Sequence, residues 1–504
     1  MKNKSLLIVS LITAMGLTAC GSLNTDVDQE LPRDDPSSTV TINFWSCLGH
    51  MKTENIMKIV NAFNTKWTGK YKVEMVHLAG DYDDLDSATK TKLASGETPA
   101  LGMGYPDSFS SYMTNNIGDS SLLRLNNFIN DPDYGYSAEE LADFVPGYYA
   151  EGTNYQFEGT WSMPMYKSTE VMYYNYSYFM GVNPQNVKKF ADNAEFTSLY
   201  NTASGRNLEN DDGTLPADLQ AVKTWVQAHN GYTYEVPETW DQAIALARQM
   251  KADREAMGLT DVFYPFGYDS DANLLISQMA QRNIPYTVND DASKKDPNKH
   301  FQFVNDDAKA LVGEIIGYIR EKIMCTKNSL GDVYTNTLFN AGACAFTVGS
   351  TGGSSYNISS NFAVKIAPVP YKGQRKYIQQ GPSICFFDNE DPYIHKGAWL
   401  FYKEFADATN NAVVALENSY DPIRVSSYST SKYADWIAMS GSGLKYDIPA
   451  ITATLKDYYI TSPVFVGSGT ARKEIGRIIS NVYSSNYSID KAFNEALDIC
   501  KAAA

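Results

Sequence analysis

Apolar and polar positions alternate near the start of the chain and then change their period. Apolar side chains occupy every second position of residues 39–45, which predicts a strand. In residues 53–67 they recur at helical spacing, and in residues 71–75 they alternate again. A strand, a helix and a second strand in so short a stretch indicate a βαβ unit and a parallel sheet.

Helical spacing recurs in four later stretches, namely residues 239–250, 306–324, 395–406 and 488–501. Residues 239–242, Thr-Trp-Asp-Gln, fit a capping box and predict where the first of these helices begins. The pattern therefore predicts an α/β protein. Because about 465 residues follow residue 39, too many for one hydrophobic core, we expect two lobes with several chain crossings between them.

The first residues have the pattern of an export signal. Lys2 and Lys4 precede an apolar run over residues 6–17, which is too short for a stable membrane span. The run ends in Leu-Thr-Ala-Cys-Gly, residues 17–21, which resembles the bacterial lipoprotein cleavage box. That resemblance implies that Cys20 is lipidated and becomes the mature N-terminus. An ordinary secretory signal with an incidental cysteine is the alternative.

Residues 21–39 are polar and carry two prolines, which is typical of a flexible tether. We therefore expect a signal peptide over residues 1–19, and the lipidated cysteine with its tether over residues 20–39. No other stretch has about 18 consecutive apolar residues, so the protein is expected to be anchored to a membrane and not to span it.

Charge and cysteine content exclude several classes of function. The formal charge of −16 becomes −18 without Lys2 and Lys4, and such a surface repels nucleic acid and anionic lipid. The five cysteines after Cys20 are odd in number and form no C-x-x-C pair, so neither a disulfide framework nor a zinc site is indicated. One disulfide remains compatible with the sequence.

No catalytic constellation stands out. The five histidines are scattered, and neither a G-x-S-x-G elbow nor a Walker loop occurs. A carboxylate pair for glycoside hydrolysis is spatial, so the sequence leaves it open. The 35 tyrosines and 7 tryptophans are more informative, because flat aromatic faces stack on sugars, although most such residues in a large protein belong to its core.

Several motifs in one order resemble a known family. They are FW at residues 44–45, SGETPALGMGYPDS at 95–108, TWSMPMYKSTEVMYYN at 160–175, ETWDQAIALA at 238–247, FNAGACAFTVGSTGG at 339–353, QQGPSICFF at 379–387, SYDPIR at 419–424 and SIDKAFNEAL at 488–497. Together they resemble the extracellular solute-binding proteins of ABC importers, in the branch of maltose and glycerol-phosphate binders.

This resemblance implies a type II periplasmic-binding-protein fold, maltose-binding-like, with two α/β lobes around a cleft. Lobe 1 is expected to comprise residues 40–166 and 348–388, and lobe 2 residues 167–347 and 389–504. The three hinge crossings are expected near residues 164–169, 346–350 and 382–390.

The resemblance also implies ligand-binding positions. Tyr82, Ser168, Ser350, Gly381 and Tyr420 match ligand-contacting positions of the glycerol-phosphate binder. The family's acidic contact becomes Asp107, displaced by one residue. Its late arginine matches Arg472 or Arg477, and Arg477 is taken as the candidate. Trp45, at the end of the first strand, and Lys167, in place of a serine, complete the expected site.

The expected function is that of an ABC-transporter lipoprotein on the outer face of the cytoplasmic membrane. It would capture a carbohydrate or a glycerol-phosphate-like polyol and deliver it to the permease, as a monomer, without catalysis, metal, cofactor or nucleic acid. A surface-anchored glycan hydrolase or an adhesin is the alternative, and turnover of a bound sugar would favour the hydrolase.

Overall fold

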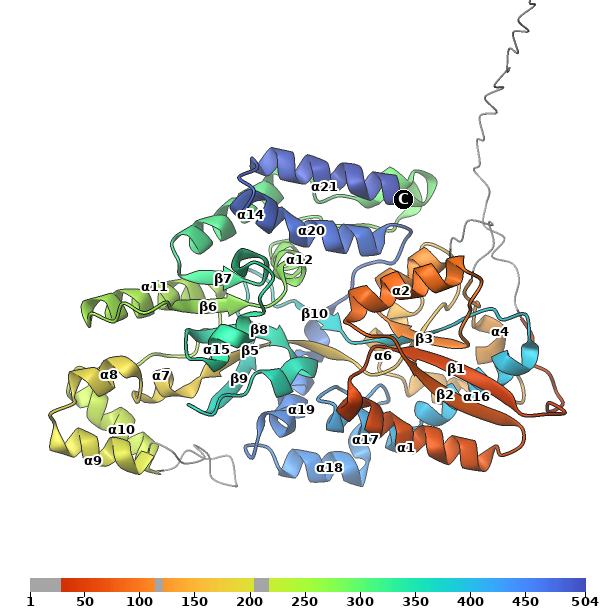
Figure 1. Cartoon of the computed structure of the whole chain (residues 1–504), viewed down its shortest axis with the longest axis horizontal. Coiled ribbons are helices and arrows are strands. Elements are labelled where there is room, and N and C mark those ends of the chain that lie inside the picture. The colour runs from red at the N-terminus through yellow and green to blue at the C-terminus, as the bar shows by residue number, and fades with distance from the viewer. Residues whose placement is uncertain (1–28, 114–120, 204–216) are drawn as a thin grey trace, which may run out of the picture.

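A computed structural model of the chain describes residues 29–113, 121–203 and 217–504, and Figure 1 shows two bodies of mixed helix and sheet side by side. Each body has its own hydrophobic core, one built around Phe44, Phe63 and Trp399, and the other around Phe266, Ile315 and Phe346. We call them lobe 1 and lobe 2. The two separate cores confirm the expected two-lobe α/β fold. The expected signal peptide and Cys20 lie outside the described residues.

The sheet of lobe 1 has five strands in the order β2-β1-β3-β11-β4. β1 is parallel to β2 and β3, whereas β11 is antiparallel to β3 and β4. The predicted βαβ unit is confirmed, because helix α1 follows β1 and buries Ile56, Val60 and Phe63 on lobe 1. The strands are β1 Val40–Ser46, β2 Tyr71–His77, β3 Leu101–Gly104, β4 Met163–Pro164 and β11 Ser383–Phe386.

The sheet of lobe 2 has seven strands in the order β12-β10-β5-β8-β6-β7, with β9 also paired to β5. β5 is the central strand of this sheet, and its residues are almost entirely buried because helices cover it. The strands are β5 Ser168–Asn175, β6 Tyr264–Tyr268, β7 Met324–Thr326, β8 Cys344–Ser350, β9 Val364–Pro368, β10 Tyr377–Gln380 and β12 Tyr459–Ile460.

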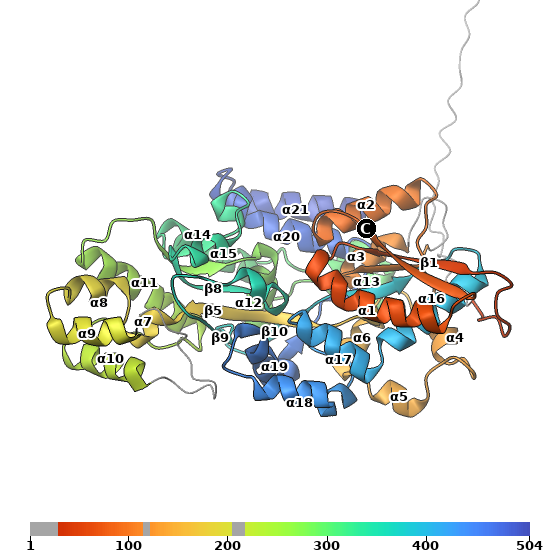
Figure 2. The same ribbon diagram turned by 60° about the horizontal axis from the view of Figure 1, so that its bottom comes forward.

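The helices cover both sheets (Figures 1 and 2). Lobe 1 carries α1 His50–Lys66, α2 Tyr82–Ala94, α3 Pro106–Phe109, α4 Asn126–Ile129, α5 Ala138–Ala142, α6 Pro146–Glu151, α16 Pro392–Phe405 and α17 Ala408–Glu417, with the 3₁₀ turns η1 Ser110–Tyr112 and η5 Ser426–Ser429. Lobe 2 carries α7 Tyr176–Met180, α8 Pro184–Lys189, α9 Ala194–Ala203, α10 Ala217–Ala228, α11 Trp240–Ala256, α12 Asp271–Gln281, α13 Asp291–Lys295, α14 Asp306–Arg320, α15 Thr335–Asn340, α20 Ser468–Tyr483 and α21 Ile489–Ala503, with η2 Pro297–His300, η3 Asn328–Leu330 and η4 Thr351–Tyr356. The third connection between the lobes contains α18 Ser431–Ala438, which packs on α17, α19 Leu444–Leu455, which also contacts β9, and η6 Lys456–Tyr458.

The four helices expected from apolar spacing are α11, α14, α16 and α21. The capping box before α11 is also present, since the side chain of Thr239 accepts from the Gln242 amide and that of Gln242 accepts from the Thr239 amide. No helix in the described part of the chain is long and apolar enough to cross a membrane.

The strand pairing differs from the expected division of residues. The expected crossing near residues 346–350 is wrong, because β8 lies inside the seven-stranded sheet between β5 and β6. β9 and β10 therefore belong to lobe 2, whereas α16 packs on β1 of lobe 1. The chain passes between the sheets at residues 165–167 and 381–382, and a third time through residues 430–458.

The folded part also begins earlier than expected. Leu31 is 3% exposed and belongs to the lobe 1 core, so the described end of the expected tether lies on the protein. Leu31 and Pro36 explain why this segment lies on lobe 1. Both are apolar and buried, although the stretch around them is rich in charged residues.

Candidate functional site

A small cavity lies between the two lobes, beside the passage at residues 381–382. Its volume is about 40 Å³, whereas sites for drug-sized ligands span roughly 300–1,000 Å³. The two lobes are therefore in contact at this cavity, with too little free space between them for a drug-sized ligand. Lobe 1 contributes Tyr105, Pro106, Asp107 and Glu151, and lobe 2 contributes Ile378, Gln379, Gln380 and Arg472. The loop after β12 contributes Thr461, Ser462 and Val464, of which Val464 packs on Tyr155 of lobe 1.

At one end of the cleft, helix α20 of lobe 2 meets helix α3 of lobe 1. The hydroxyl of Ser468 donates to the carbonyl oxygen of Asp107 at 3.2 Å. Arg472, one turn further along α20, places its Nε 3.8 Å from Oδ2 of Asp107. Burial raises the pKa of Asp107, and the positive charge of Arg472 partly opposes that rise.

Arg472 is held from behind by polar groups of lobe 2. Its Nη2 donates to Oδ1 of Asn273, and Nδ2 of Asn273 donates to Oε1 of Glu170 at 2.8 Å. The hydroxyl of Tyr268 donates to the other oxygen of Glu170 at 2.6 Å. Burial raises the pKa of Glu170 to about 7, although both hydrogen bonds oppose the rise. A chain of polar contacts thus runs from the lobe 2 sheet to Asp107 of lobe 1.

A second set of contacts joins the lobes through η4. Nζ of Lys52 in lobe 1 donates to the carbonyl oxygen of Gly352 in lobe 2 at 2.7 Å. The ring of Tyr420 packs against the same glycine, where an added Cβ would lie 2.6 Å from its Cζ. Only a glycine allows this approach of the two lobes.

Comparison of this sequence with known protein families shows to which family the chain belongs. The model of the family "Bacterial extracellular solute-binding protein" matches residues 58–441. The chain belongs to this family. No curated protein is significantly similar to it in sequence.

Solved structures show the same fold at low sequence identity. The GacH receptor of Streptomyces glaucescens, solved unliganded and with acarbose, is 15% identical with a TM-score of 0.63, over 92% of this chain and 98% of that one. UgpB of Mycobacterium tuberculosis, in complex with glycerophosphocholine, gives the same four values. Lmo0181 of Listeria monocytogenes, in complex with cycloalternan, is 13% identical with a TM-score of 0.64, over 93% and 99%. This solute-binding protein therefore has the two-lobe, maltose-binding-like fold.

Lys167 lies in the first passage between the lobes and does not face the cleft. Its side chain is fully buried, and Nζ donates to Glu151 and, at 2.9 Å, to Oγ of Ser383. The carbonyl oxygen of Gly381 in the second passage lies 3.3 Å from the same Nζ. The expected ligand contact of Lys167 is untested, whereas its charge joins the two passages.

Backbone conformation and close packing both favour glycine at position 381. Its φ of +95° is strained for other residues, and an added Cβ would lie 2.7 Å from the carbonyl oxygen of Tyr166. The two passages therefore pack backbone against backbone at this point. The expected ligand contact of Gly381 is untested, whereas its role in packing follows from the geometry.

Four other expected residues lie around the closed cleft. The rings of Tyr82 and Tyr105 are 4.6 Å apart, and the rings of Tyr420 and Tyr166 are 4.3 Å apart. Oγ of Ser350 donates to Oγ of Ser168 at 3.4 Å. None of Tyr82, Ser168, Ser350 and Tyr420 is among the residues that line the small cavity, but opening the lobes would uncover the Tyr420 contact.

Two expected residues lie elsewhere. Trp45 is 3% exposed within β1, with Nζ of Lys92 5.3 Å from its ring centre. Arg477 has a half-exposed side chain that pairs with Glu474 on the same helix at 2.6 Å. Positions 472 and 477 are five residues apart, which is about 140° around a helix, so they cannot face the same way. Arg472 lines the cavity and Arg477 is not among its lining residues, so Arg472 becomes the candidate that we test.

The sequence reasoning missed several cavity residues. Gln379 and Gln380 stand directly before Gly381, so the QQGP motif could have indicated them. Glu151, which lines the cavity, and Glu170, which is linked to Arg472 through Asn273, carry no such signal, because their partners are not adjacent in sequence. In the described part of the chain, no group of three metal-ligating side chains is brought together.

Proposed function

We propose that the protein captures a neutral carbohydrate or polyol in the cleft between its lobes and delivers it to an ABC-importer permease. The charge arrangement around Arg472 carries this proposal. Asp107 stands 3.8 Å from its Nε, and Glu170 is linked to it through Asn273. The positive charge of Arg472 is thereby already compensated, which suits hydrogen bonding to hydroxyl groups.

A phosphate ester fits this cleft less well. It would have to displace Asp107 from Arg472 and would bring its charge close to Glu151, another acid that lines the cavity. Two lysines near the cleft are already engaged: Lys167 pairs with Glu151 and has no exposed surface, and Nζ of Lys52 donates to the Gly352 carbonyl. Like charges at short distance are unfavourable, so the cleft disfavours glycerol phosphate relative to a neutral solute.

Buried polar atoms give further support. The hydroxyls of Tyr82 and Tyr166, Nε2 of Gln379 and Oε1 of Gln380 are buried and have no hydrogen-bond partner among the described residues. An unmade buried hydrogen bond costs about 1–3 kcal/mol. Hydroxyl groups of a solute can supply partners to both amides and hydroxyls, and the neighbouring aromatic rings can stack on its C–H faces.

The structural neighbours support the same solute class. The GacH receptor was solved with acarbose, Lmo0181 with cycloalternan, and a binding protein of Thermotoga lettingae with α-D-tagatose. UgpB was solved with glycerophosphocholine, which makes phosphate-containing solutes the comparison to test.

Closure supplies the signal to the permease. Ligand that contacts both lobes favours the closed form by its difference in affinity for the two forms. Catalysis plays no part in this mechanism. We also propose that Cys20 carries the lipid that holds the protein, as a monomer, on the outer face of the cytoplasmic membrane. Replacing Cys20 with Ala should release the protein from membranes and abolish incorporation of a radioactive fatty acid.

A melting-temperature screen tests the solute class. Neutral mono- and oligosaccharides, polyols and glycerol phosphates are added to the purified protein at equal concentrations. We expect a concentration-dependent rise in Tm with a neutral compound, which mass spectrometry then recovers unchanged. A rise with glycerol phosphates alone, or conversion of the compound, would contradict the proposal.

A further inference from the structure

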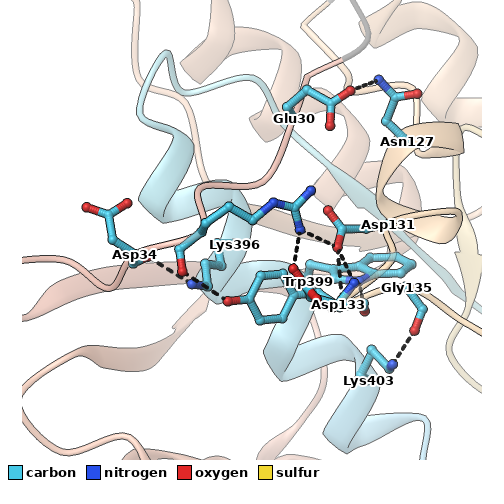
Figure 3. Close-up of polar contacts among 11 residues, drawn as sticks. Glu30, Asp34, Asn127, Asp131, Asp133, Gly135, Lys396, Trp399 and Lys403 are labelled. Atoms are coloured by element: carbon cyan, nitrogen blue, oxygen red, sulfur yellow. Dashed lines mark hydrogen bonds and ion pairs between the residues drawn. The ribbon is translucent and has the colours of Figure 1, made fainter.

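Residues 29–38 form a strap that lies across lobe 1. Figure 3 shows its polar contacts, in which Asn127 donates to Oε1 of Glu30 at 2.9 Å. Between these contacts, Leu31 and Pro36 are buried, and Leu31 belongs to the lobe 1 core. The strap is therefore fixed by apolar burial as well as by charge.

Arg33 ties the strap to the turn that follows α4. Its Nη1 donates to Oδ1 of Asp131 at 2.7 Å and to Oδ2 of Asp133 at 3.0 Å. The hydroxyl of Tyr134 donates back to the carbonyl oxygen of Arg33 at 3.3 Å. The Asp131 side chain is 1% exposed, so the positive charge of Arg33 balances the charge of a carboxylate that is almost completely buried.

The next two residues tie the strap to helix α16. The hydroxyl of Tyr393 donates to Oδ2 of Asp34 at 2.9 Å, and Nζ of Lys396 donates to the carbonyl oxygen of Asp34 at 2.8 Å. Asp35 pairs with Lys396 and with Lys70 at the start of β2. The Lys396 side chain is 1% exposed and depends on the strap for these contacts.

All these partners belong to lobe 1. α4 and α16 lie at the end of the molecule away from α8 to α11 of lobe 2 (Figures 1 and 2). Residue 29, the first of the strap, is nine steps along the chain from Cys20, and an extended chain spans at most about 3.6 Å per step, or roughly 32 Å in all. The α4 end of lobe 1 is thus held close to any anchor at Cys20.

We propose that the strap clamps the membrane anchor to lobe 1, so that lobe 1 is the held lobe and lobe 2 is the lobe that swings when the cleft opens. This rests on the lipid anchor of the proposed function. A freely hinged tether would leave both lobes equally mobile relative to the membrane, whereas the strap restricts the orientation of lobe 1 and presents lobe 2 and its half of the cleft as the moving part.

Trypsin cleavage after Arg33 tests whether the strap is clamped. Under native conditions we expect the wild-type protein to be cut at Arg33 at least tenfold more slowly than a free peptide of residues 26–40. Leu31→Ser should accelerate this cut about tenfold, and Tyr393→Phe should accelerate it less. Leu497→Ser, which alters a partly buried leucine at the lobe 2 core, is the matched control and should leave the rate unchanged. Equal rates for the wild-type protein and the peptide would overturn the proposal.

Energy transfer to an acceptor lipid tests which lobe is held. The acylated protein, carrying Cys47→Ser, is labelled at Glu139→Cys in lobe 1 or at Glu195→Cys in lobe 2 and bound to vesicles. Both positions are exposed. We expect at least twofold more efficient transfer from lobe 1, and Leu31→Ser should remove at least half of the difference. Equal transfer from both labels in the wild-type background would overturn the held-lobe assignment. Membrane binding that survives Cys20→Ala would overturn the lipid anchor and the held lobe together, while the trypsin rates would stay as expected, so the two failures are distinguishable.

Discussion

Two cation–carboxylate pairs stand at the boundary between the lobes, and they differ in burial and distance. Lys167 and Glu151 have side chains 0% and 10% exposed, with Nζ also bonded to Ser383. Arg472 and Asp107 are 25% and 18% exposed, and their charged atoms stand 3.8 Å apart across the cleft. The first pair is enclosed where the chain passes between the lobes, whereas the second is loose and reachable by water.

This difference in burial and distance indicates which pair matters for folding and which for ligand binding. Breaking an enclosed pair leaves an uncompensated buried charge, so its main effect is on folding. A loose pair contributes little to stability but retains donors and acceptors that a ligand can use. We therefore propose that the first pair mainly holds the passages between the lobes, with Glu151 also at the cavity wall, and that the second pair contacts the solute.

The largest expected effect is on the enclosed pair. Lys167→Met strands the Glu151 carboxylate and should lower the free energy of unfolding by about 3–5 kcal/mol. Lys72→Met removes a lysine from an exposed pair and should cost less than about 1 kcal/mol. Urea unfolding measures both. Because Glu151→Gln removes the stranded charge, the double variant should recover part of the loss, and strict additivity would contradict the pairing.

The loose pair should show the opposite behaviour. Arg472→Ala should weaken binding of the solute by about 10- to 100-fold, roughly 1.4–2.8 kcal/mol, while Tm without ligand changes little. Arg477→Ala is the matched control on the same helix, since that side chain points away from the cleft. Titration calorimetry compares the two. A weakening by Arg477→Ala equal to that of Arg472→Ala would refute the assignment.

Gly381 tests the packing of the two passages. Gly381→Ala forces a positive φ on alanine and a contact of 2.7 Å with the Tyr166 carbonyl, so we expect a loss of about 1–3 kcal/mol. At Gly353 an added Cβ meets nothing within 4 Å, and Gly353→Ala should be close to neutral. Thermal unfolding distinguishes them, and equal Tm values for the two variants would show that the close approach is absent.

Glu170 gives an expected effect of similar size to that of Gly381, seen as a dependence of stability on pH. Burial raises the pKa of Glu170 to about 7 in the folded state, above its ordinary value of about 4.3. Between about pH 4.3 and pH 7, Glu170 therefore binds more protons in the folded protein than in the unfolded chain. Its contribution to the free energy of unfolding falls as pH rises from about 4.3 to 7 and is constant above that. Glu170→Gln should reduce the loss of unfolding free energy between pH 5 and 8 by about 1–3 kcal/mol, as measured by urea unfolding at both pH values. An identical slope in both proteins would rule out the shift.

The sequence predicted helices well where apolar residues recur along one face of the helix. Helices α11, α14, α16 and α21 follow from apolar spacing, and the start of α11 follows from its capping box. The place of β8 could not be predicted in this way, because a buried strand has the same pattern in either lobe. The same limit applies to Lys167, whose partners Glu151 and Ser383 are 16 and 216 residues away.

The site was predictable in part. Family motifs indicated Asp107, which lines the cavity, and the aromatic residues around it. Choosing between Arg472 and Arg477 required knowing which face of α20 meets α3, which is a property of packing between lobes. The strap was hidden for a related reason, since residues 29–38 are polar in composition and their burial depends on partners in α16 and after α4.

Direct titration of the wild-type protein tests the central claim that the cleft selects a neutral solute. The neutral compound with the largest effect on Tm and glycerol 3-phosphate are each titrated calorimetrically, alone and in competition. We predict saturable one-site binding of the neutral compound and at least tenfold weaker binding of glycerol 3-phosphate. Tighter binding of glycerol 3-phosphate would contradict the account, because it would mean that Arg472 is free to receive a phosphate.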